Sequence, residues 1–193
     1  SHRSQDAGVP PTKIVLSEGG EDMTVTDHDA LVGRTLDQRF VTPERIARGR
    51  MATVYRATDL RLDRTVAVKV MHANTPVDTS PGHFAREAKS SAKLNHRGIV
   101  SVYDQGTDGE TTYLVMEYVP GRTLRDVLRD EAPMPPRRAL SYLESVLMAL
   151  AAAHDGHVIH RDIKPENVLI STTGEIKLAD FGLARATDAD SAT

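Results

Sequence analysis

Carboxylate and amide side chains that could take part in phosphoryl transfer lie between His160 and Gly182. The chain reads His-Arg-Asp-Ile-Lys-Pro-Glu-Asn from position 160 and Asp-Phe-Gly from position 180. Transfer of a phosphoryl group needs a carboxylate that orients and deprotonates the attacking hydroxyl, and oxygen ligands that hold magnesium against the phosphates. Asp162 suits the first task. Asn167 and Asp180 suit the second, because Mg²⁺ prefers carboxylate and amide oxygens.

Two short strands must bring these side chains together. The apolar run after Asn167 predicts a strand over residues 167–170, a polar turn over 171–174 and a second strand over 175–178. That hairpin would return Asp180 to the side of Asn167. Taken alone, Asp180 would be an ordinary solvated carboxylate, but several spacings that agree at once favour a site.

These residues form the H-R-D-x-x-x-x-N and D-F-G motifs, and on them the chain resembles protein kinases. The D-x-K-P-E-N stretch is similar to the serine/threonine branch of that family. The resemblance implies that Lys164 lies near the transferred phosphate and the substrate hydroxyl. It also implies that Arg161 pairs with a phosphorylated residue of the activation loop, where Thr187, Ser191 and Thr193 are candidates.

An upstream lysine fits the same family. Val-Ala-Val-Lys at positions 66–69 alternates like a strand and matches V-A-I-K. A lysine on an apolar strand needs an anionic partner unless it lies at an exposed edge. Glu87, on a helix expected over residues 84–94, is the candidate partner. The resemblance implies that Lys69 binds the α- and β-phosphates of ATP and that Glu87 positions it.

The glycine-rich flap of the family is only partly kept. Strands expected over residues 40–47 and 53–59 flank a turn in which Ala47 and Ala52 replace the outer glycines, and only Gly49 remains. Taken alone, this stretch favours an ordinary hairpin over a flap. Its place in the motif order, with Val54 where the family has valine, favours a weakened nucleotide flap.

The resemblance also assigns the adenine pocket. The strand expected over residues 113–119 would lead into the hinge, where the backbone of Glu117 and Val119 would bond adenine and Met116 would be the gatekeeper. A buried central strand would show the same apolar run. Apolar side chains on both sides would enclose the purine: Ile46, Val54, Ala67 and Leu169.

The predicted fold is α+β and protein-kinase-like. Residues 1–31 are predicted to be disordered, 32–119 to form an antiparallel-sheet N-lobe with one helix and the hinge, and 120–193 to form the first part of a mainly helical C-lobe. A strand is expected over residues 99–103 before a turn over 104–110. Helices are expected over residues 124–129 and about 140–154, the second stopped by Gly156.

The chain stops within what the family uses as the activation loop, without an A-P-E motif. We therefore expect a truncated kinase domain whose long C-lobe helix leaves apolar surface exposed, which favours poor stability or self-association. The first methionine is Met23, and natural translation is expected to start there, which mass spectrometry of the natural product would test.

The charge, the cysteine content and the lengths of the apolar runs limit the kinds of partner and environment expected for this chain. The formal charge is 24 minus 27, or −3, there is no cysteine, and no apolar run approaches the roughly 18 residues of a membrane span. We expect no nucleic-acid partner, no membrane segment and no disulfide, and a cytoplasmic location, although a longer parent protein could be membrane-anchored.

The stretches at 67–71 and 102–106 are similar to bacterial, actinobacterial-type, eukaryotic-like serine/threonine kinases. The predicted function is transfer of the γ-phosphate of ATP, with Mg²⁺, to Ser and Thr hydroxyls of protein substrates. The alternative is a kinase-like fragment that binds nucleotide or a protein partner and transfers nothing.

Overall fold

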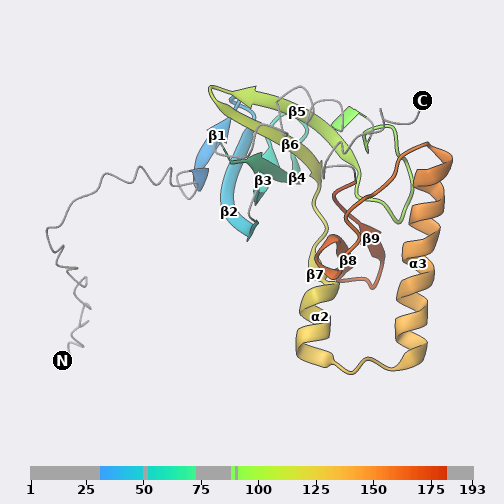
Figure 1. Cartoon of the computed structure of the whole chain (residues 1–193). Helices are drawn as coiled ribbons and strands as arrows, with labels where there is room; N and C mark the ends of the chain where they lie inside the picture. Colours follow the sequence, from blue (N-terminus) through green and yellow to red (C-terminus); the bar gives the residue numbers. More distant parts are fainter. Residues whose placement is uncertain (1–30, 50–51, 73–87, 90, 182–193) are drawn as a thin grey trace, which may run out of the picture.

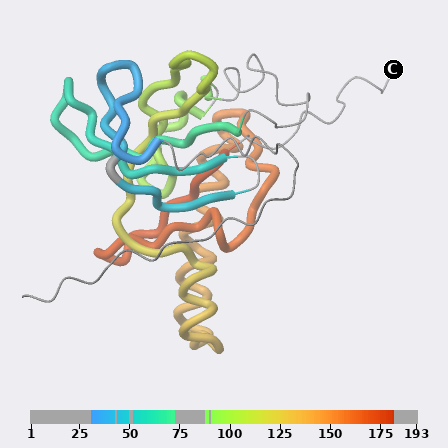
Figure 2. Tube along the Cα trace, turned by 90° about the vertical axis from the view of Figure 1, so that its left-hand side faces the viewer, coloured from blue at the N-terminus to red at the C-terminus, as the bar shows by residue number. Residues whose placement is uncertain are grey.

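The computed structural model describes residues 31–49, 52–72, 88–89 and 91–181. Within them, a six-stranded antiparallel sheet lies above a smaller three-stranded sheet that is flanked by two helices (Figure 1). Turned by 90°, the same chain shows the two helices extending below both sheets (Figure 2). The upper sheet has the order β1-β2-β3-β4-β6-β5 and the lower has β7-β8-β9. The strands are β1 Arg34–Leu36, β2 Phe40–Arg48, β3 Ala52–Asp59, β4 Arg64–Met71, β5 Val102–Asp108, β6 Thr111–Glu117, β7 Gly121–Thr123, β8 Val168–Ser171 and β9 Ile176–Leu178.

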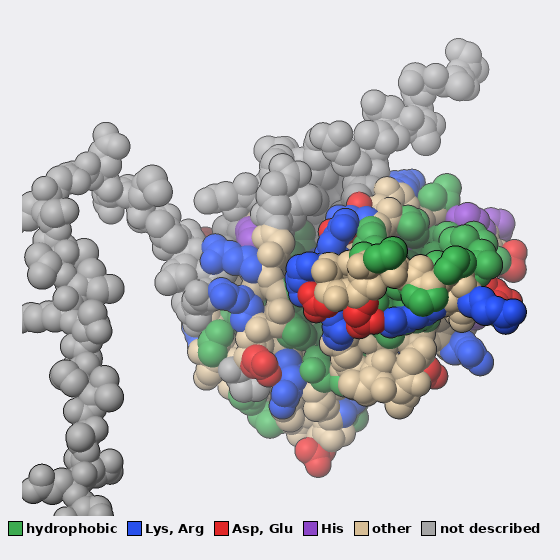
Figure 3. Space-filling model, turned by 90° about the horizontal axis from the view of Figure 1, so that it is seen from below, with side chains coloured by type: hydrophobic (Ala, Val, Ile, Leu, Met, Phe, Trp, Pro, Cys, Tyr) green, Lys and Arg blue, Asp and Glu red, His purple; other side chains and the backbone are tan. Residues whose placement is uncertain are grey.

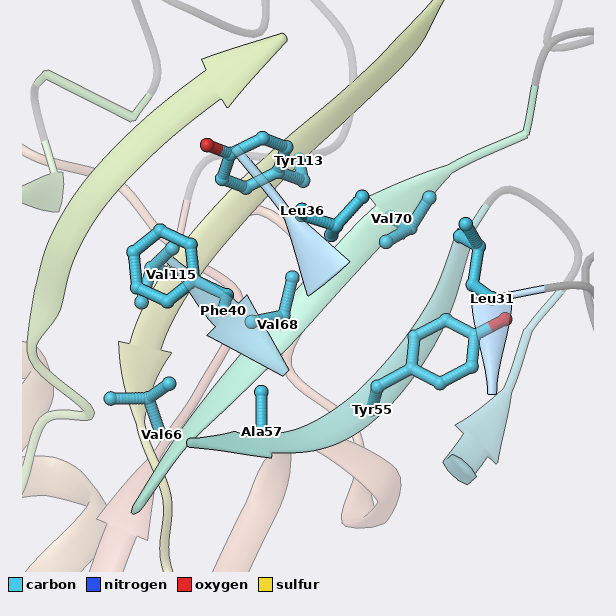
Figure 4. Close-up of a cluster of buried hydrophobic side chains, with 10 residues drawn as sticks. All are labelled: Leu31, Leu36, Phe40, Tyr55, Ala57, Val66, Val68, Val70, Tyr113 and Val115. Carbon is cyan, nitrogen blue, oxygen red and sulfur yellow. The ribbon is translucent and has the colours of Figure 1, made fainter. Parts of the chain in front are cut away.

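Side chains along β4 alternate between a buried face and the opposite face of the sheet. Val66, Val68 and Val70 are fully buried on one face, where they pack with aromatic residues of neighbouring strands (Figure 4). Because successive side chains of a strand point to opposite faces, Ala67 and Lys69 face the other side. The buried valines therefore fix the direction in which Lys69 points.

The expected antiparallel pairing of the strands near residues 40–47 and 53–59 is confirmed, but the expected boundaries of β5 are wrong. Residues 104–108 continue β5 instead of forming a turn, and Ile99 makes a single parallel bridge to Leu178. Gly106 is the reason for the error. A Cβ atom there would lie 2.3 Å from the hydroxyl oxygen of Tyr113, so glycine here permits a close approach within a sheet and does not mark a turn.

The lower part of the chain begins with a capped helix. Thr123 ends β7 and caps α2, Leu124–Glu131, through a reciprocal capping box with Asp126. The 20-residue helix α3, Pro136–Asp155, begins at a proline, earlier than the start expected near residue 140, and it ends at Gly156, as predicted. None of the described helices is both long enough and apolar enough to span a bilayer.

Helix α3 buries one narrow face and exposes another apolar one. Val146, Ala149 and Ala153 pack against a cluster that includes Leu178 and Phe181. On the outer surface, 52–64% of each of four large apolar side chains is exposed: Leu140, Leu143, Leu147 and Met148. Seen from below, the molecule shows hydrophobic side chains at the surface among charged ones (Figure 3).

A buried carboxylate ties the strands of the upper sheet together. Asp59, at the end of β3, is fully buried and accepts hydrogen bonds of 2.8 and 2.7 Å from the guanidinium of Arg39. Arg39 also reaches Asp104 of β5 at 2.9 Å. The hydrogen bonding by Arg39 outweighs burial and lowers the pKa of Asp59 from 3.8 to about 2.

Replacing this carboxylate should destabilise the fold in a pH-dependent way. Asp59→Asn leaves Arg39 without its buried partner, and we expect the free energy of unfolding at pH 7 to fall by about 3 kcal/mol. Because the folded pKa is depressed, the stabilisation by Asp59 is present above pH 3.8 and is lost as pH falls toward 2. The difference in free energy of unfolding between wild type and Asp59→Asn should therefore decrease as the pH falls over that range.

Chemical denaturation followed by circular dichroism at pH 7 and at pH 3 measures both effects. Asp63→Asn, in the exposed β3–β4 turn, is the matched control, because Asp63 is exposed. An Asp59→Asn variant as stable as this control at pH 7 would contradict the role of the buried pair.

Candidate active site

The ion pair between Lys69 and Asp180 joins the two sheets. Lys69 extends from β4, Asp180 follows β9, and the Lys69 Nζ atom lies 2.7 Å from the Asp180 Oδ1 atom. The exposed fractions of the two side chains are 12% and 29%. Lys69 thus has the anionic partner that its place on an apolar strand requires. Asp180 was not the partner expected from the sequence; the expected partner, Glu87, lies outside the described residues, as do Thr187, Ser191 and Thr193.

A second cluster forms around Asp162. The 3-10 turn η3, Pro165–Asn167, folds Asn167 back so that its side-chain amide donates to the Asp162 carbonyl at 2.8 Å and to its carboxylate at 3.1 Å. The Lys164 Nζ atom lies 2.6 Å from the same carboxylate. Partial burial opposes ionisation of Asp162, but Lys164 and Asn167 outweigh it, and the pKa of Asp162 lies below its ordinary value. The predicted grouping of Asp162, Lys164 and Asn167 is thus present in space.

His160 connects the two clusters. Its ring is buried, its Nε2 atom lies 2.8 Å from the Ala179 carbonyl, and it contacts the Phe181 ring at a centroid distance of 4.6 Å. Its Nδ1 atom accepts a hydrogen bond from the Asp162 amide at 3.2 Å. Burial lowers the pKa of His160, which favours the neutral ring. The sequence prediction gave His160 no role, although its place in the H-R-D motif was the available signal.

The segment that carries Asp180 is anchored on both sides. The Ala179 amide donates to the Asn167 carbonyl at 2.8 Å, so Asp180 directly follows a residue bonded to Asn167, as the hairpin predicted. Asp180 has φ of 63° and Arg161 has φ of 66°. Residues other than glycine seldom adopt this left-handed conformation, and such residues concentrate at functional sites.

An apolar cluster between the sheets contains most residues expected around a purine. Ala67 and Met116 are buried in it, and Val54, Val119 and Leu169 pack against it. Ile46 is outside this cluster, with 46% of its surface exposed.

The β2–β3 hairpin and the end of β6 both adjoin this cluster, through Val54 and Met116. Ala47 pairs with Val54 across the hairpin, and the Gly49 amide donates to the Ala52 carbonyl at 2.8 Å. At the end of β6, the Glu117 amide donates to the Ser101 carbonyl at 2.8 Å. Because the Glu117 amide is already used in this bond, a backbone hydrogen bond from Glu117 to a ligand would have to be accepted by its carbonyl oxygen.

The donor set fits magnesium that is held jointly with a nucleotide. Among the residues that the structure describes, no group of three or more His, Asp or Glu is placed to hold a metal alone. Mg²⁺ is commonly bound by one or two carboxylates together with substrate phosphates and water. Asn167 and Asp180 supply oxygen donors of that kind.

Comparison with known proteins agrees with this geometry. Residues 40–193 match the protein kinase domain family. Serine/threonine-protein kinase PknL of Mycobacterium bovis is 50% identical over 166 residues, which are 86% of this chain and 42% of PknL. PknB of Mycobacterium tuberculosis is 47% identical over 156 residues, which are 78% of this chain and 25% of PknB. PrkC of Bacillus subtilis is 42% identical over 157 residues, which are 81% of this chain and 24% of PrkC.

The chain therefore spans less than half the length of each of these relatives. The family match nevertheless covers most of the chain and includes every described residue of both clusters. On this match and on the arrangement of Lys69, Asp162, Asn167 and Asp180, the chain belongs to the protein kinase family.

Proposed function

We propose that this chain is the nucleotide-binding and catalytic-loop part of a serine/threonine protein kinase, which transfers the γ-phosphate of ATP to Ser and Thr hydroxyls of proteins. The observation that carries the proposal is the Lys69–Asp180 ion pair, which joins the two sheets beside the apolar cluster. The names of the relatives and the Asp162–Lys164 contact support the serine/threonine assignment. Because ATP is a cytoplasmic substrate, the proposal places this part of the protein in the cytoplasm.

Each side chain of the two clusters has a proposed role. Asp162 orients the substrate hydroxyl and accepts its proton, and its lowered pKa keeps it ionised at neutral pH. Lys164 stays beside Asp162 and contacts the transferred phosphate. Lys69 binds the α- and β-phosphates, with Glu87 as its second proposed partner. Asn167 and Asp180 hold Mg²⁺, which neutralises charge on the phosphates when bound.

The adenine subsite follows from the apolar cluster and the end of β6. Glu117 through its carbonyl and Val119 through its backbone are proposed to bond the adenine edge. Apolar side chains and the flap are proposed to cover the rest of the nucleotide: Ile46, Ala47, Gly49, Val54, Ala67 and Leu169.

The direct test is radiolabelled phosphate transfer from Mg·ATP to the chain itself and to a generic basic protein. Loss of the general base in Asp162→Asn should lower the rate at least about 100-fold. Asp155→Asn is the matched control, because Asp155 is an exposed residue at the end of α3. It should transfer phosphate at the wild-type rate.

Four outcomes of this assay distinguish a working kinase site from the alternatives. Transfer that Asp162→Asn abolishes supports the proposal. Nucleotide binding without transfer by the wild-type chain would instead support a kinase-like piece that only binds nucleotide or a partner. Transfer by Asp162→Asn at the wild-type rate, or failure of the folded wild-type chain to bind ATP, would contradict the assigned site.

We also propose that the chain associates with itself through the exposed apolar face of α3. Leu143 and Leu147 lie one helical turn apart and are 52% and 55% exposed, so pairing this face with a second copy would bury apolar surface. The double variant Leu143→Glu/Leu147→Glu should remove concentration-dependent association in analytical ultracentrifugation. Ser141→Glu adds a charge to the same helix without removing an apolar side chain, and it should associate like wild type. Equal association of all three proteins would exclude this face.

A further inference from the structure

A second ion pair joins the two sheets on the hinge side of the site. Lys177 of β9 places its Nζ atom 2.9 Å from Oε1 and 3.1 Å from Oε2 of Glu117, the last residue of β6. Both side chains are largely shielded, with exposed fractions of 14% for Lys177 and 23% for Glu117. Such shielding strengthens the attraction relative to a pair on an open surface.

A backbone connection runs beside this ion pair. The Leu178 amide donates to the Gly98 carbonyl at 2.8 Å, and the Val100 amide donates to the Leu178 carbonyl at 2.9 Å. Residue 101 then bonds to the end of β6. The Glu117 amide donates to the Ser101 carbonyl at 2.8 Å, and the Ser101 amide donates to Glu117 Oε2 at 3.2 Å. Residues 98–101 thus link β9 to β6, and Lys177 bridges the same two strands directly.

Both ends of this link lie next to proposed site residues. Lys177 precedes Asp180 by three positions, and Leu178 and Ala179 between them are both buried. Glu117 directly follows Met116 and supplies the proposed carbonyl contact to adenine. A shift of β9 relative to β6 would therefore move the proposed metal carboxylate and the adenine edge relative to each other.

We propose that the Glu117–Lys177 pair, with residues 98–101, is a positioning device that sets the distance between the adenine edge and Asp180. The pair acts through other residues: Lys177 touches no reacting group, and its effect reaches the phosphates through β9 and Asp180. This inference rests on the proposed function. It deepens that proposal by naming the contact that fixes the position of Asp180 relative to the adenine edge at the end of β6.

The test uses the full chain with four substitutions. Lys177→Met and Glu117→Gln each remove the ion pair, whereas Lys177→Arg keeps the charge. Arg56→Met is the matched control, because Arg56 is a strand cation whose 3.2 Å pair with Glu44 stays within the upper sheet. Calorimetry gives the Kd for Mg·ATP, and phosphate transfer gives KM for ATP and kcat.

Loss of the pair should weaken Mg·ATP binding and raise KM for ATP by roughly tenfold, as is typical when a residue that orients a metal ligand is removed. Lys177→Arg should restore both values to within about threefold of wild type. Arg56→Met should match wild type. The double variant Lys177→Met/Glu117→Gln should lose no more than either single variant, because the two residues act as one unit.

Hydrogen exchange without nucleotide separates failure of this inference from failure of the proposed function. In Lys177→Met, the Leu178 amide, which donates to Gly98, and the Val100 amide, which donates to Leu178, should exchange roughly tenfold faster because both bonds depend on the pair. The buried Val68 amide should not change. If wild type binds no ATP, the proposed function fails and the positioning role fails with it, whatever the exchange shows. If wild type binds ATP, an unchanged Kd, KM and exchange in Lys177→Met, or faster transfer than wild type, would overturn the positioning role alone.

Discussion

The desolvation of Lys69 is the constraint on which the described site depends. Lys69 lies among apolar neighbours on β4 and only 12% of its side chain is exposed, so its ammonium group is costly unless a carboxylate faces it. The Asp180 carboxylate faces it at 2.7 Å. Lys69 belongs to the upper sheet and Asp180 to the segment after β9, so satisfying one buried charge requires both parts of the chain to be in place. The same pair places a carboxylate and an ammonium beside the apolar cluster, and the proposed binding of magnesium and nucleotide phosphates rests on this arrangement.

The surrounding structure keeps this contact in register. Val66, Val68 and Val70 bury one face of β4 and direct Lys69 to the other. His160 fixes residues 179–181 against the catalytic loop through the Ala179 carbonyl and the Phe181 ring. The Glu117–Lys177 ion pair joins β9 to the end of β6. Hydrophobic packing thus sets the direction of each element, and a few shielded polar contacts set the distances between the groups that would do chemistry.

Much of this arrangement could be predicted from the sequence, because motif spacing reports local geometry. The hairpin after Asn167, the direction of β4 and the helix ended by Gly156 all follow from short-range patterns. What the sequence could not provide depends on contacts between distant residues. Gly106 suggested a turn because the approach of Tyr113 cannot be seen in one strand, and the Glu117–Lys177 pair joins residues 60 positions apart. The role of His160 likewise depends on Ala179 and Phe181, which only the folded chain brings to its ring.

The central claim is that Asp180 joins Lys69 in a site for magnesium and ATP, and its most direct test is the effect of Mg²⁺ on ATP affinity. Calorimetric titration of the wild-type chain with ATP should show affinity at least about tenfold higher with Mg²⁺ than with EDTA. In Asp180→Asn this difference should shrink, because the neutral amide keeps an oxygen donor but removes the negative charge that holds the ion. An equal dependence on Mg²⁺ in wild type and in Asp180→Asn would contradict the account.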